Sequence, residues 1–522
     1  MSYWAKPPMD RSQIVLFAPT LDSMIPEDHS VRLFEEILSR MDWSGWEVHY
    51  CLCQGQPPIH PKVLAGVLLY GMSLGIRSSR MLERACRVQF DFLWLASGEA
   101  PDHSTLCEFR TRFRTELKGL FRQIGHLAMT MGLIRLNQVG LDGTRVLANS
   151  SRHGTRSARS IEAKLAELDP LIEQMLQECE QADRKDQELF GAASMELPGE
   201  LKDLQRRKEA LEKALRQARQ IDVRRSERSD RTKKEAKVPV ADPDSAVLPN
   251  KEGGYAPNYS PVAAVDAHRG FVVDEDCDAQ AGEDHTTLPA IEHIEQTFGQ
   301  KPQQLLADGA HGTGRNLTEL EAMGVDAYIP PINERPAQEN PALREDLTQP
   351  VAPSEWDKLP RSGQNKKLDK SAFVYVPEQD CYYCPMGRPL RYVRESQQQR
   401  QQEAVRYRHY GCIGCQDCPL AAVCKGQGNR TRSVSRDQHE DVRQAMIAKL
   451  SSEAGRKTYG RRKWICETVF AMGKGNWGFR RFLLRGLEKV RTEWTWLCTA
   501  LNLGKLTREV RRMRASFAAM CV

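Results

Sequence analysis

One short stretch, residues 138–147 (Gln-Val-Gly-Leu-Asp-Gly-Thr-Arg-Val-Leu), limits most strongly what this chain can fold into. Apolar residues alternate with others at period two along it, which predicts a half-buried β-strand. The strand carries one carboxylate, Asp142, between Leu141 and Gly143. Burying an acid costs free energy unless a partner compensates for the lost water, and a bound cation is a common partner. Asp142 is therefore either a metal ligand or an acid that caps a turn at the strand end.

Two further acids occupy comparable positions. Asp308 ends an apolar run and precedes a Gly-rich turn, which is where α/β sheets place functional residues. Glu467 belongs to a set of four residues, Tyr459, Lys463, Glu467 and Lys474, spaced by four, four and seven positions. This spacing predicts that the four share one face of a single helix. A carboxylate amid so many positive charges indicates either a structural ion pair or a site for metal ions and phosphate.

Length and charge limit the class of protein. A chain of 522 residues is expected to hold about two to four domains with at least one sizeable core. The net charge is only +6, but residues 443–514 contain 18 Lys and Arg against 5 Asp and Glu, a local charge of +13. This concentration favours nucleic acid as a partner over a plain solvated helix surface. Because no run of 18 apolar residues and no signal-peptide core is present, we expect a cytoplasmic protein without membrane contact.

Helices are expected to dominate residues 1–130. Apolar residues recur at helical spacing over 61–75, 78–86 and 106–120. The last of these predicted helices is rich in arginine, including Arg110 and Arg112. This region is therefore interpreted as either a helix-turn-helix-like DNA-binding domain or a plain helical bundle with a charged face.

Residues 155–240 repeat leucine and isoleucine at coiled-coil spacing, which predicts an antiparallel helical hairpin, kinked or divided at Pro170. Its basic far end is expected either to touch DNA or to be a solvated tip. The following segment, 257–273, predicts a β-hairpin. Asp266 ends the first strand of that hairpin and is the weaker alternative to Asp142.

A helix over 284–298, the strand before Asp308, a short strand at 327–329 and the late helix with Glu467 complete the series of elements. This order predicts a mixed α/β fold of the ribonuclease H-like kind. Residues 330–372 are rich in Pro, Asn, Gln and charge, which predicts a long loop.

Six cysteines fall within 44 positions: Cys381, Cys384, Cys412, Cys415, Cys418 and Cys424. Two residues between paired thiols let both sulfurs face one tetrahedral ion, so the pattern predicts a structural Zn²⁺ site, with an iron-sulfur cluster as the alternative. Six thiols exceed the four that one zinc ion needs, and the ligand set stays open.

The three acids in their sequence contexts resemble the catalytic triad of DDE transposases encoded by bacterial insertion sequences. The contexts are Gly-Leu-Asp-Gly-Thr, Leu-Ala-Asp-Gly-Ala-His-Gly and a helix of Tyr, basic residues, Glu and Lys. Residues 60–80, 101–105 and 478–486 also contain segments that resemble such enzymes. Two positions depart from the family pattern: Glu467 lies one place later after Arg462 than usual, and Ala310 and His311 stand where an aromatic residue is commoner.

The resemblance and the predicted elements together imply four regions. These are a helical, helix-turn-helix-like DNA-binding domain (1–130), a ribonuclease H-like catalytic core (138–154 with 255–335 and 440–506), a helical-hairpin insertion (155–240) and a loop with a Cys-rich zinc-binding insertion (336–435).

The resemblance also implies a chemistry. Asp142 is expected to bridge two Mg²⁺ ions, with Mn²⁺ as a substitute, while Asp308 and Glu467 each hold one. Lys474, and more weakly Tyr459, Arg462 and Lys463, would contact DNA phosphate. The expected partners are terminal inverted repeats and target DNA, bound by a homodimer in the bacterial nucleoid. A Mg²⁺-dependent nuclease without strand transfer, and an inactive DNA-binding zinc protein, are the alternatives.

Overall fold

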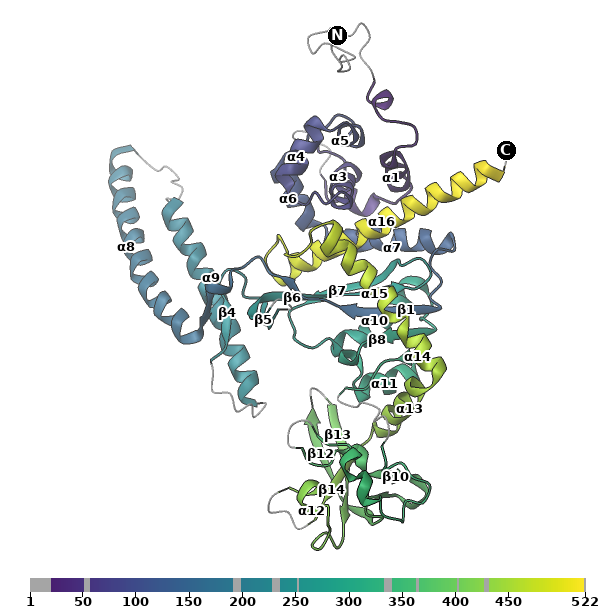
Figure 1. Cartoon of the computed structure of the whole chain (residues 1–522). Coiled ribbons are helices and arrows are strands. Elements are labelled where there is room, and N and C mark those ends of the chain that lie inside the picture. Colours follow the sequence, from purple (N-terminus) through teal and green to yellow (C-terminus); the bar gives the residue numbers. More distant parts are fainter. Residues whose placement is uncertain are drawn as a thin grey trace, which may run out of the picture. The chain divides into compact units, whose positions relative to one another are not determined.

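The computed structural model describes residues 20–50, 57–190, 199–227, 235–250, 253–332, 340–362, 366–400, 403–426 and 431–520 (Figure 1). The chain divides into two compact units, Met1–Pro302 with Lys463–Val522, and Gln303–Arg462. The segments predicted to form the catalytic core fall in both units. Among the described residues, no helix combines the length and the apolar character needed to cross a membrane.

The N-terminal part of the first unit is helical, as predicted. Its main helices are α1 (Ser30–Ser39), α3 (Pro61–Ser73), α4 (Ser79–Val88), α5 (Phe90–Leu95), α6 (His103–Arg112) and α7 (Arg114–Thr130). The prediction of one helix over 106–120 is wrong, because the backbone leaves the helical region at Phe113 (φ −104°, ψ 59°). The break lets the Phe113 ring pack 5.3 Å from Trp46 and 5.0 Å from Phe109, measured between ring centroids.

A buried ion pair joins these helices to the C-terminal helix α16 (Leu487–Met520). Nη2 of Arg77 donates to Oε1 of Glu493 at 2.7 Å and to the carbonyl oxygen of Arg481 at 2.8 Å. Glu493 also accepts hydrogen bonds from the backbone N–H groups of Leu483 and Leu484. The segments around residues 77 and 483, which lie far apart in the sequence, therefore meet at one carboxylate.

The sheet of the first unit is built on the long strand β6 (Tyr255–Asp266). It pairs antiparallel with β1 (Gln138–Gly143) and β7 (Val272–Asp278), and its first half pairs with β2 (Val146–Leu147) and β5 (Ala246–Pro249). The predicted hairpin over 257–273 is thereby confirmed, and both of its strands extend beyond the predicted bounds. Helix α16 covers β7, where the side chain of Asn502 bonds the backbone of Val272 in both directions.

The prediction that residues 138–147 form one half-buried strand is wrong. Strand β1 ends at Gly143, β2 begins at Val146, and residues 138–141 are all buried. Helix α15 (Arg462–Ala471) presses on one face: a Cβ atom added to Gly140 would lie 2.5 Å from Sγ of Cys466 and 2.8 Å from Cγ2 of Ile465. The alternation of apolar and other residues predicted a strand with one face in water. Here the strand is buried by the elements packed against it, so the prediction fails.

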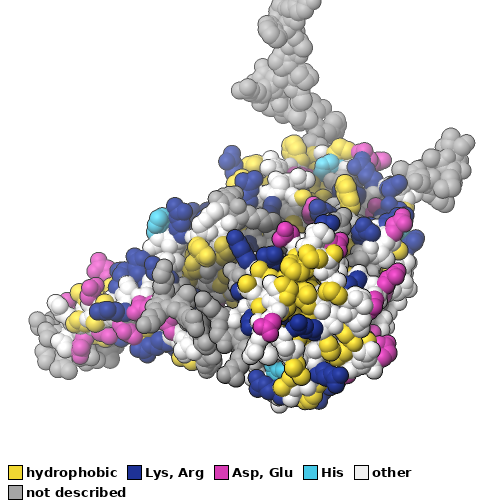
Figure 2. Space-filling model, turned by 60° about the horizontal axis from the view of Figure 1, so that its bottom comes forward, with side chains coloured by type: hydrophobic (Ala, Val, Ile, Leu, Met, Phe, Trp, Pro, Cys, Tyr) yellow, Lys and Arg dark blue, Asp and Glu magenta, His cyan; other side chains and the backbone are white. Residues whose placement is uncertain are grey.

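The helical hairpin consists of α8 (Ala158–Phe190) and α9 (Gly199–Glu227), which pack through residues that include Ile161, Leu168, Leu211 and Ala214. Of the two expected outcomes at Pro170, a kink or a division, division is excluded, since α8 continues through this residue (Figure 1). Pro170 is exposed, so water can replace the backbone hydrogen bond that proline cannot make. Lys and Arg side chains intermingle with Asp and Glu over the hairpin, at the left of Figure 2, which suits a solvated surface.

The second unit begins with a parallel pair. Strand β8 (Gln304–Ala307) leads through α11 (Gly314–Ala322) to β9 (Asp326–Tyr328). Three antiparallel strands (β1, β6 and β7), then α10 (Thr287–Phe298), then this parallel pair is the chain order of a ribonuclease H-like core. The predicted mixed α/β fold class is confirmed.

The same unit contains a five-stranded antiparallel sheet of β10 (Val374–Val376), β11 (Cys381–Tyr383), β12 (Pro389–Arg400), β13 (Glu403–Cys412) and β14 (Ser433–Asp437). The described part of 330–372, predicted to be a long loop, is mostly irregular, with two short 3₁₀ turns, Pro353–Lys358 and Lys370–Ala372. Val351, Leu359 and Leu368 are buried against this sheet, so the segment forms one wall of its core. Sparse apolar residues without a period gave no signal of this packing.

Candidate active site

Asp142 lies near the end of β1, opposite Ala263 of β6, and its Oδ1 accepts a hydrogen bond from the Gly143 N–H at 3.0 Å. Residues two apart on a strand face the same side, so Asp142 points to the side of the sheet where Gly140 meets α15. Glu467 follows Cys466 on that helix and is exposed. The elements that carry Asp142 and Glu467 are therefore in direct contact within the first unit.

The prediction of a single helix from Tyr459 to Lys474 is wrong. Tyr459 belongs to α14 (Glu453–Gly460), Glu467 to α15, and Lys474 to a π-helical turn, Met472–Asn476. Gly460 ends the first helix, because glycine lowers the stability of a helix through its backbone freedom. Spacing by four residues therefore does not place all four side chains on one face.

Lys474 is held beside the chain that follows Asp142. Its Nζ donates to Oγ1 of Thr144 at 2.5 Å and to the carbonyl oxygen of Arg145 at 3.0 Å. The π-helical turn thus places an ammonium group next to the end of β1, where the sequence predicted a contact with DNA phosphate.

In the second unit, Asp308 follows β8 directly. Its Oδ1 accepts from the Ala310 N–H at 2.8 Å, which begins a short 3₁₀ turn, Gly309–His311. A carboxylate oxygen of Asp308 and a ring nitrogen of His311 lie within 4.8 Å of each other, and His311 is fully buried. Carboxylate oxygen and imidazole nitrogen can both bind divalent metal ions. From the sequence, His311 was interpreted only as a departure from the family pattern. Its position three residues after Asp308 was the one sign that its side chain could lie near that acid.

A second residue missed by the sequence analysis is Glu283, in the turn before α10. A Cβ atom on Gly143 would come within 2.8 Å of the carboxylate atoms of Glu283, so this acid lies against the residue that follows Asp142. Nearby, Asp278 accepts a hydrogen bond from His285, which raises the pKa of His285 above its ordinary value. The polar run 283–285 was the only sequence signal for this acidic neighbourhood.

Asp266, the weaker alternative to Asp142, is held by hydrogen bonds within the protein. Its carboxylate accepts backbone N–H bonds from Leu136 at 2.8 Å and His268 at 2.9 Å, and the residue is 1% exposed. These donors offset the cost of burying the acid without any metal ion.

The predicted DNA contacts in the N-terminal region separate into two cases. Arg110 is only 5% exposed and donates through Nη1 to the carbonyl oxygen of Arg77, so its prediction as a DNA contact is wrong. Arg112 is exposed, with its guanidinium 5.1 Å from the centroid of the Phe113 ring. In the basic C-terminal third, part of the positive charge is neutralised by ion pairs such as Arg443 with Asp437.

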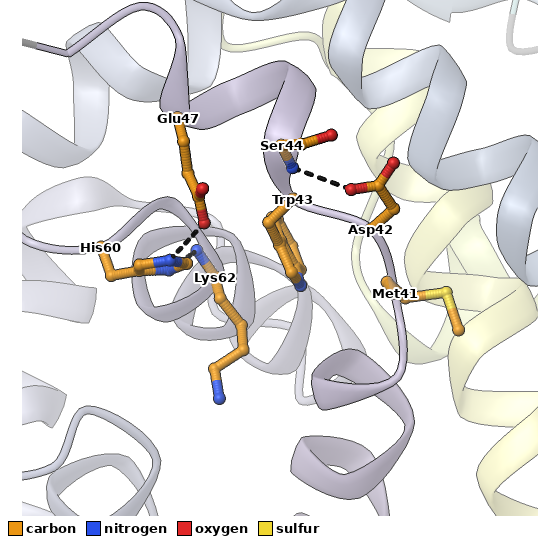
Figure 3. A pocket seen from close by; sticks show the side chains of 7 residues that line it. All are labelled: Met41, Asp42, Trp43, Ser44, Glu47, His60 and Lys62. Atoms are coloured by element: carbon orange, nitrogen blue, oxygen red, sulfur yellow. Dashed lines mark hydrogen bonds and ion pairs between the residues drawn. The ribbon is translucent and has the colours of Figure 1, made fainter.

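A surface hollow in the N-terminal helices is not a second centre of chemistry (Figure 3). It is lined by Met41, Asp42, Trp43, Ser44, Glu47, His60 and Lys62. His60 bonds Glu47 at 2.9 Å, and Asp42 accepts from the Ser44 N–H at 2.9 Å. These polar groups form hydrogen bonds with one another, and His60 also caps α3 by accepting the Lys62 N–H at Nδ1.

Gly140→Ala is expected to push α15 away from β1, because its Cβ atom would overlap Cys466 and Ile465. Overpacking of this kind costs about 1–3 kcal/mol, measurable as a lower unfolding temperature. Gly119→Ala is the matched control: nothing lies within 4 Å of its Cβ position in α7, and about 0.5–1 kcal/mol of stabilisation is expected. Removing the sulfur in Gly140→Ala/Cys466→Ala should recover part of the loss, and an unchanged Gly140→Ala protein would contradict the close packing.

Two family models match the chain. The model of the transposase DDE domain matches residues 383–507, and the model of a transposase domain (DUF772) matches residues 19–112. No curated protein matches the chain. The first match includes Glu467 and Lys474, and the second covers α1 to α6.

The elements follow the order of a ribonuclease H-like core, and transposase families match the helices α1 to α6 and residues 383–507. Together these findings indicate a protein of DNA transposition. Over residues 383–507 the chain is similar to the DDE domain of transposases, and over residues 19–112 to a second transposase domain.

Proposed function

We propose that the chain is a DDE transposase of an insertion sequence, which cleaves DNA at the ends of that element and transfers the 3′ ends to target DNA. The observation that supports this most is the close packing of β1 on α15, which brings the strand of Asp142 against the helix of Glu467. Asp308 is assigned to the same site because of its sequence context and its position directly after β8.

Asp142, Asp308 and Glu467 would hold two Mg²⁺ ions, or Mn²⁺ in their place. The donor set fits, because hard divalent cations take carboxylate oxygens in preference to thiols or imidazoles. When bound, such a pair of ions assists both the attacking and the leaving oxygen of an in-line displacement at phosphorus.

The remaining residues in this proposal bind and orient DNA. Lys474, fixed beside Thr144, would contact a phosphate near the reacting group, and Lys463, exposed on α15, a neighbouring one. Tyr459 and Arg462 are weaker candidates. Terminal inverted repeats and target DNA are the proposed partners, bound by a homodimer in the nucleoid. A structural Zn²⁺ ion in the Cys-rich region is a separate part of the proposal and takes no part in the reaction.

The test is a joining assay with the full chain, Mg²⁺, supercoiled target DNA and a duplex that carries the sequence flanking the gene. We expect products in which the 3′ ends of the duplex are covalently joined to the target. Cut duplex without joined product would instead indicate a nuclease, and a shifted but intact duplex would indicate an inactive DNA-binding protein. Either of these results would overturn the proposal.

A further inference from the structure

Five of the six clustered cysteines line one small cavity at the end of the five-stranded sheet. They are Cys384, Cys412, Cys415, Cys418 and Cys424. The cavity has a volume of about 20 Å³, which is enough for one atom or molecule the size of water. The thiols come from three segments: the turn after β11, the end of β13 with its following turn, and α12 (Ala421–Cys424).

We infer that Cys384, Cys424 and two of the three thiols at 412, 415 and 418 bind one structural Zn²⁺ ion, and that Cys381 is not a ligand. This inference refines the structural zinc ion proposed above and does not depend on strand transfer. A tetrahedral Zn²⁺ site takes four thiolates, and this set draws on all three segments.

The backbone around Cys384 already suits a metal-bound sulfur. The N–H of Arg388 donates to Sγ of Cys384 at 3.4 Å, and N–H groups of this kind stabilise a thiolate. The turn needs Gly387, whose φ is +70° and whose Cβ position would lie 2.0 Å from the Thr348 carbonyl oxygen. A second such turn contains Gly414 (φ +84°), between Cys412 and Cys415. Both turns expose a thiol to the cavity through a conformation that other residues rarely adopt.

The thiols are near one another without yet forming a closed site. Sγ of Cys415 donates to the carbonyl oxygen of Cys412 at 3.9 Å, and Cys384 lines the same cavity. Within the described residues, however, no three thiol sulfurs lie within 4.8 Å of each other. Zn–S bonds of about 2.3 Å would draw the sulfurs together by rotation of their side chains.

Charge in the cavity wall also favours a zinc-thiolate centre. Four thiolates around Zn²⁺ have a net charge of −2, which needs compensation in a mostly apolar wall. Arg388 and Arg432 line the same cavity. Arg432 is held there by the carbonyl oxygens of Cys424 at 3.0 Å and Leu368 at 3.1 Å.

Cys381 lies outside this set for a geometric reason. It occupies β11, where residues 381–383 are extended, and its Sγ donates to Oε1 of Gln379 at 3.7 Å. Two residues between cysteines bring both sulfurs to one ion when the chain turns. In a strand, residues three positions apart point to opposite faces.

The ion would bind at the end of the two-stranded ribbon formed by β12 and β13, where β12 begins and β13 ends. Leu390, near the start of β12, pairs with Cys412 at the end of β13, and Cys424 lies on a helix that is not part of the sheet. Binding across these segments would tie the helix to the ribbon and to the Leu368 segment packed beside it.

The test is metal analysis of the full chain purified without chelator. We expect about one zinc per chain in the unaltered protein and in Cys381→Ser, the matched control, and at least a tenfold loss in Cys384→Ser and Cys424→Ser. Zinc-free unaltered protein, iron with sulfide in place of zinc, or equal loss in Cys381→Ser would overturn the inference.

A second measurement covers the case in which the serine variants fail to fold. Alkylation of the folded, unaltered protein is compared with and without a chelator, and peptide mass spectrometry locates the labelled thiols. We expect chelation to expose Cys384, Cys424 and two of the other three. Protection of Cys381 by the metal would overturn the assignment. The joining assay reports separately on strand transfer, so the failure of either proposal can be told from the failure of the other.

Discussion

Asp142→Asn is expected to lower DNA joining by at least about 1,000-fold while changing the affinity for terminal DNA by less than about twofold. The substitution keeps the shape of the side chain and its bond from the Gly143 N–H, but removes the negative charge proposed to hold metal ions. A metal ion contributes several kcal/mol to the transition state of phosphoryl transfer, and each 1.4 kcal/mol is about tenfold in rate. Single-turnover joining and gel-shift titration at one salt concentration measure the two quantities.

Asp266→Asn is the control for this variant, since Asp266 also ends a strand of the same sheet. Its carboxylate accepts backbone N–H groups, including that of Leu136. We expect a lower unfolding temperature but an unchanged joining rate per folded molecule. If Asp142→Asn kept its rate, or if both variants lost activity only in proportion to their unfolding, Asp142 would be a structural acid.

Arg77→Ala is expected to destabilise the protein by about 3–5 kcal/mol. Arg77 and Glu493 form an ion pair in which the side chains are 12% and 2% exposed, and truncating one partner leaves the other charge buried and unpaired. The lost contact of the guanidinium with the Phe479 ring, 4.6 Å from its centroid, adds to the effect. Urea unfolding, followed by tryptophan fluorescence from α16, measures the loss.

Arg40→Ala is the matched control, because Arg40 pairs with Glu36 on the exposed face of α1, with the arginine side chain 68% exposed. Exposed pairs of this kind contribute about 0.3–0.5 kcal/mol. Arg77→Met/Glu493→Met removes both charges and is expected to recover part of the stability. Equal losses in Arg77→Ala and Arg40→Ala would show that the buried pair does not hold the N-terminal helices to α16.

Local patterns in the sequence predicted much of the secondary structure. Apolar residues at helical spacing placed α3 and α4, coiled-coil spacing placed the hairpin of α8 and α9, and two apolar runs around a short turn placed β6 and β7. These signals are local because helix and strand periods are properties of neighbouring residues. At Pro170 the sequence left open a kink or a division, and the structure shows that the helix continues through this exposed residue.

Errors of prediction arose where distant segments decide the outcome. Strand β1 is buried on the side of Gly140 because Cys466, more than three hundred positions later, packs against it. Arg110 matched a DNA-binding helix by composition, yet its side chain is buried and donates to the carbonyl oxygen of Arg77. Residues 340–362 and 366–372 lacked periodicity and still form a wall of the Cys-rich core, because packing needs volume and contact rather than a repeat.

By itself, the amino-acid sequence determined the chemical groups: three acids in a set order, six clustered thiols and a basic C-terminal third. Tertiary structure alone decided which of these groups meet. It placed Glu283 against Gly143 and His311 beside Asp308, separated Cys381 from the other thiols, and paired Arg77 with Glu493 across 416 positions. The physical reason is that a side chain's burial, pairing and direction depend on atoms brought next to it by the fold, and spacing along the chain does not specify those atoms.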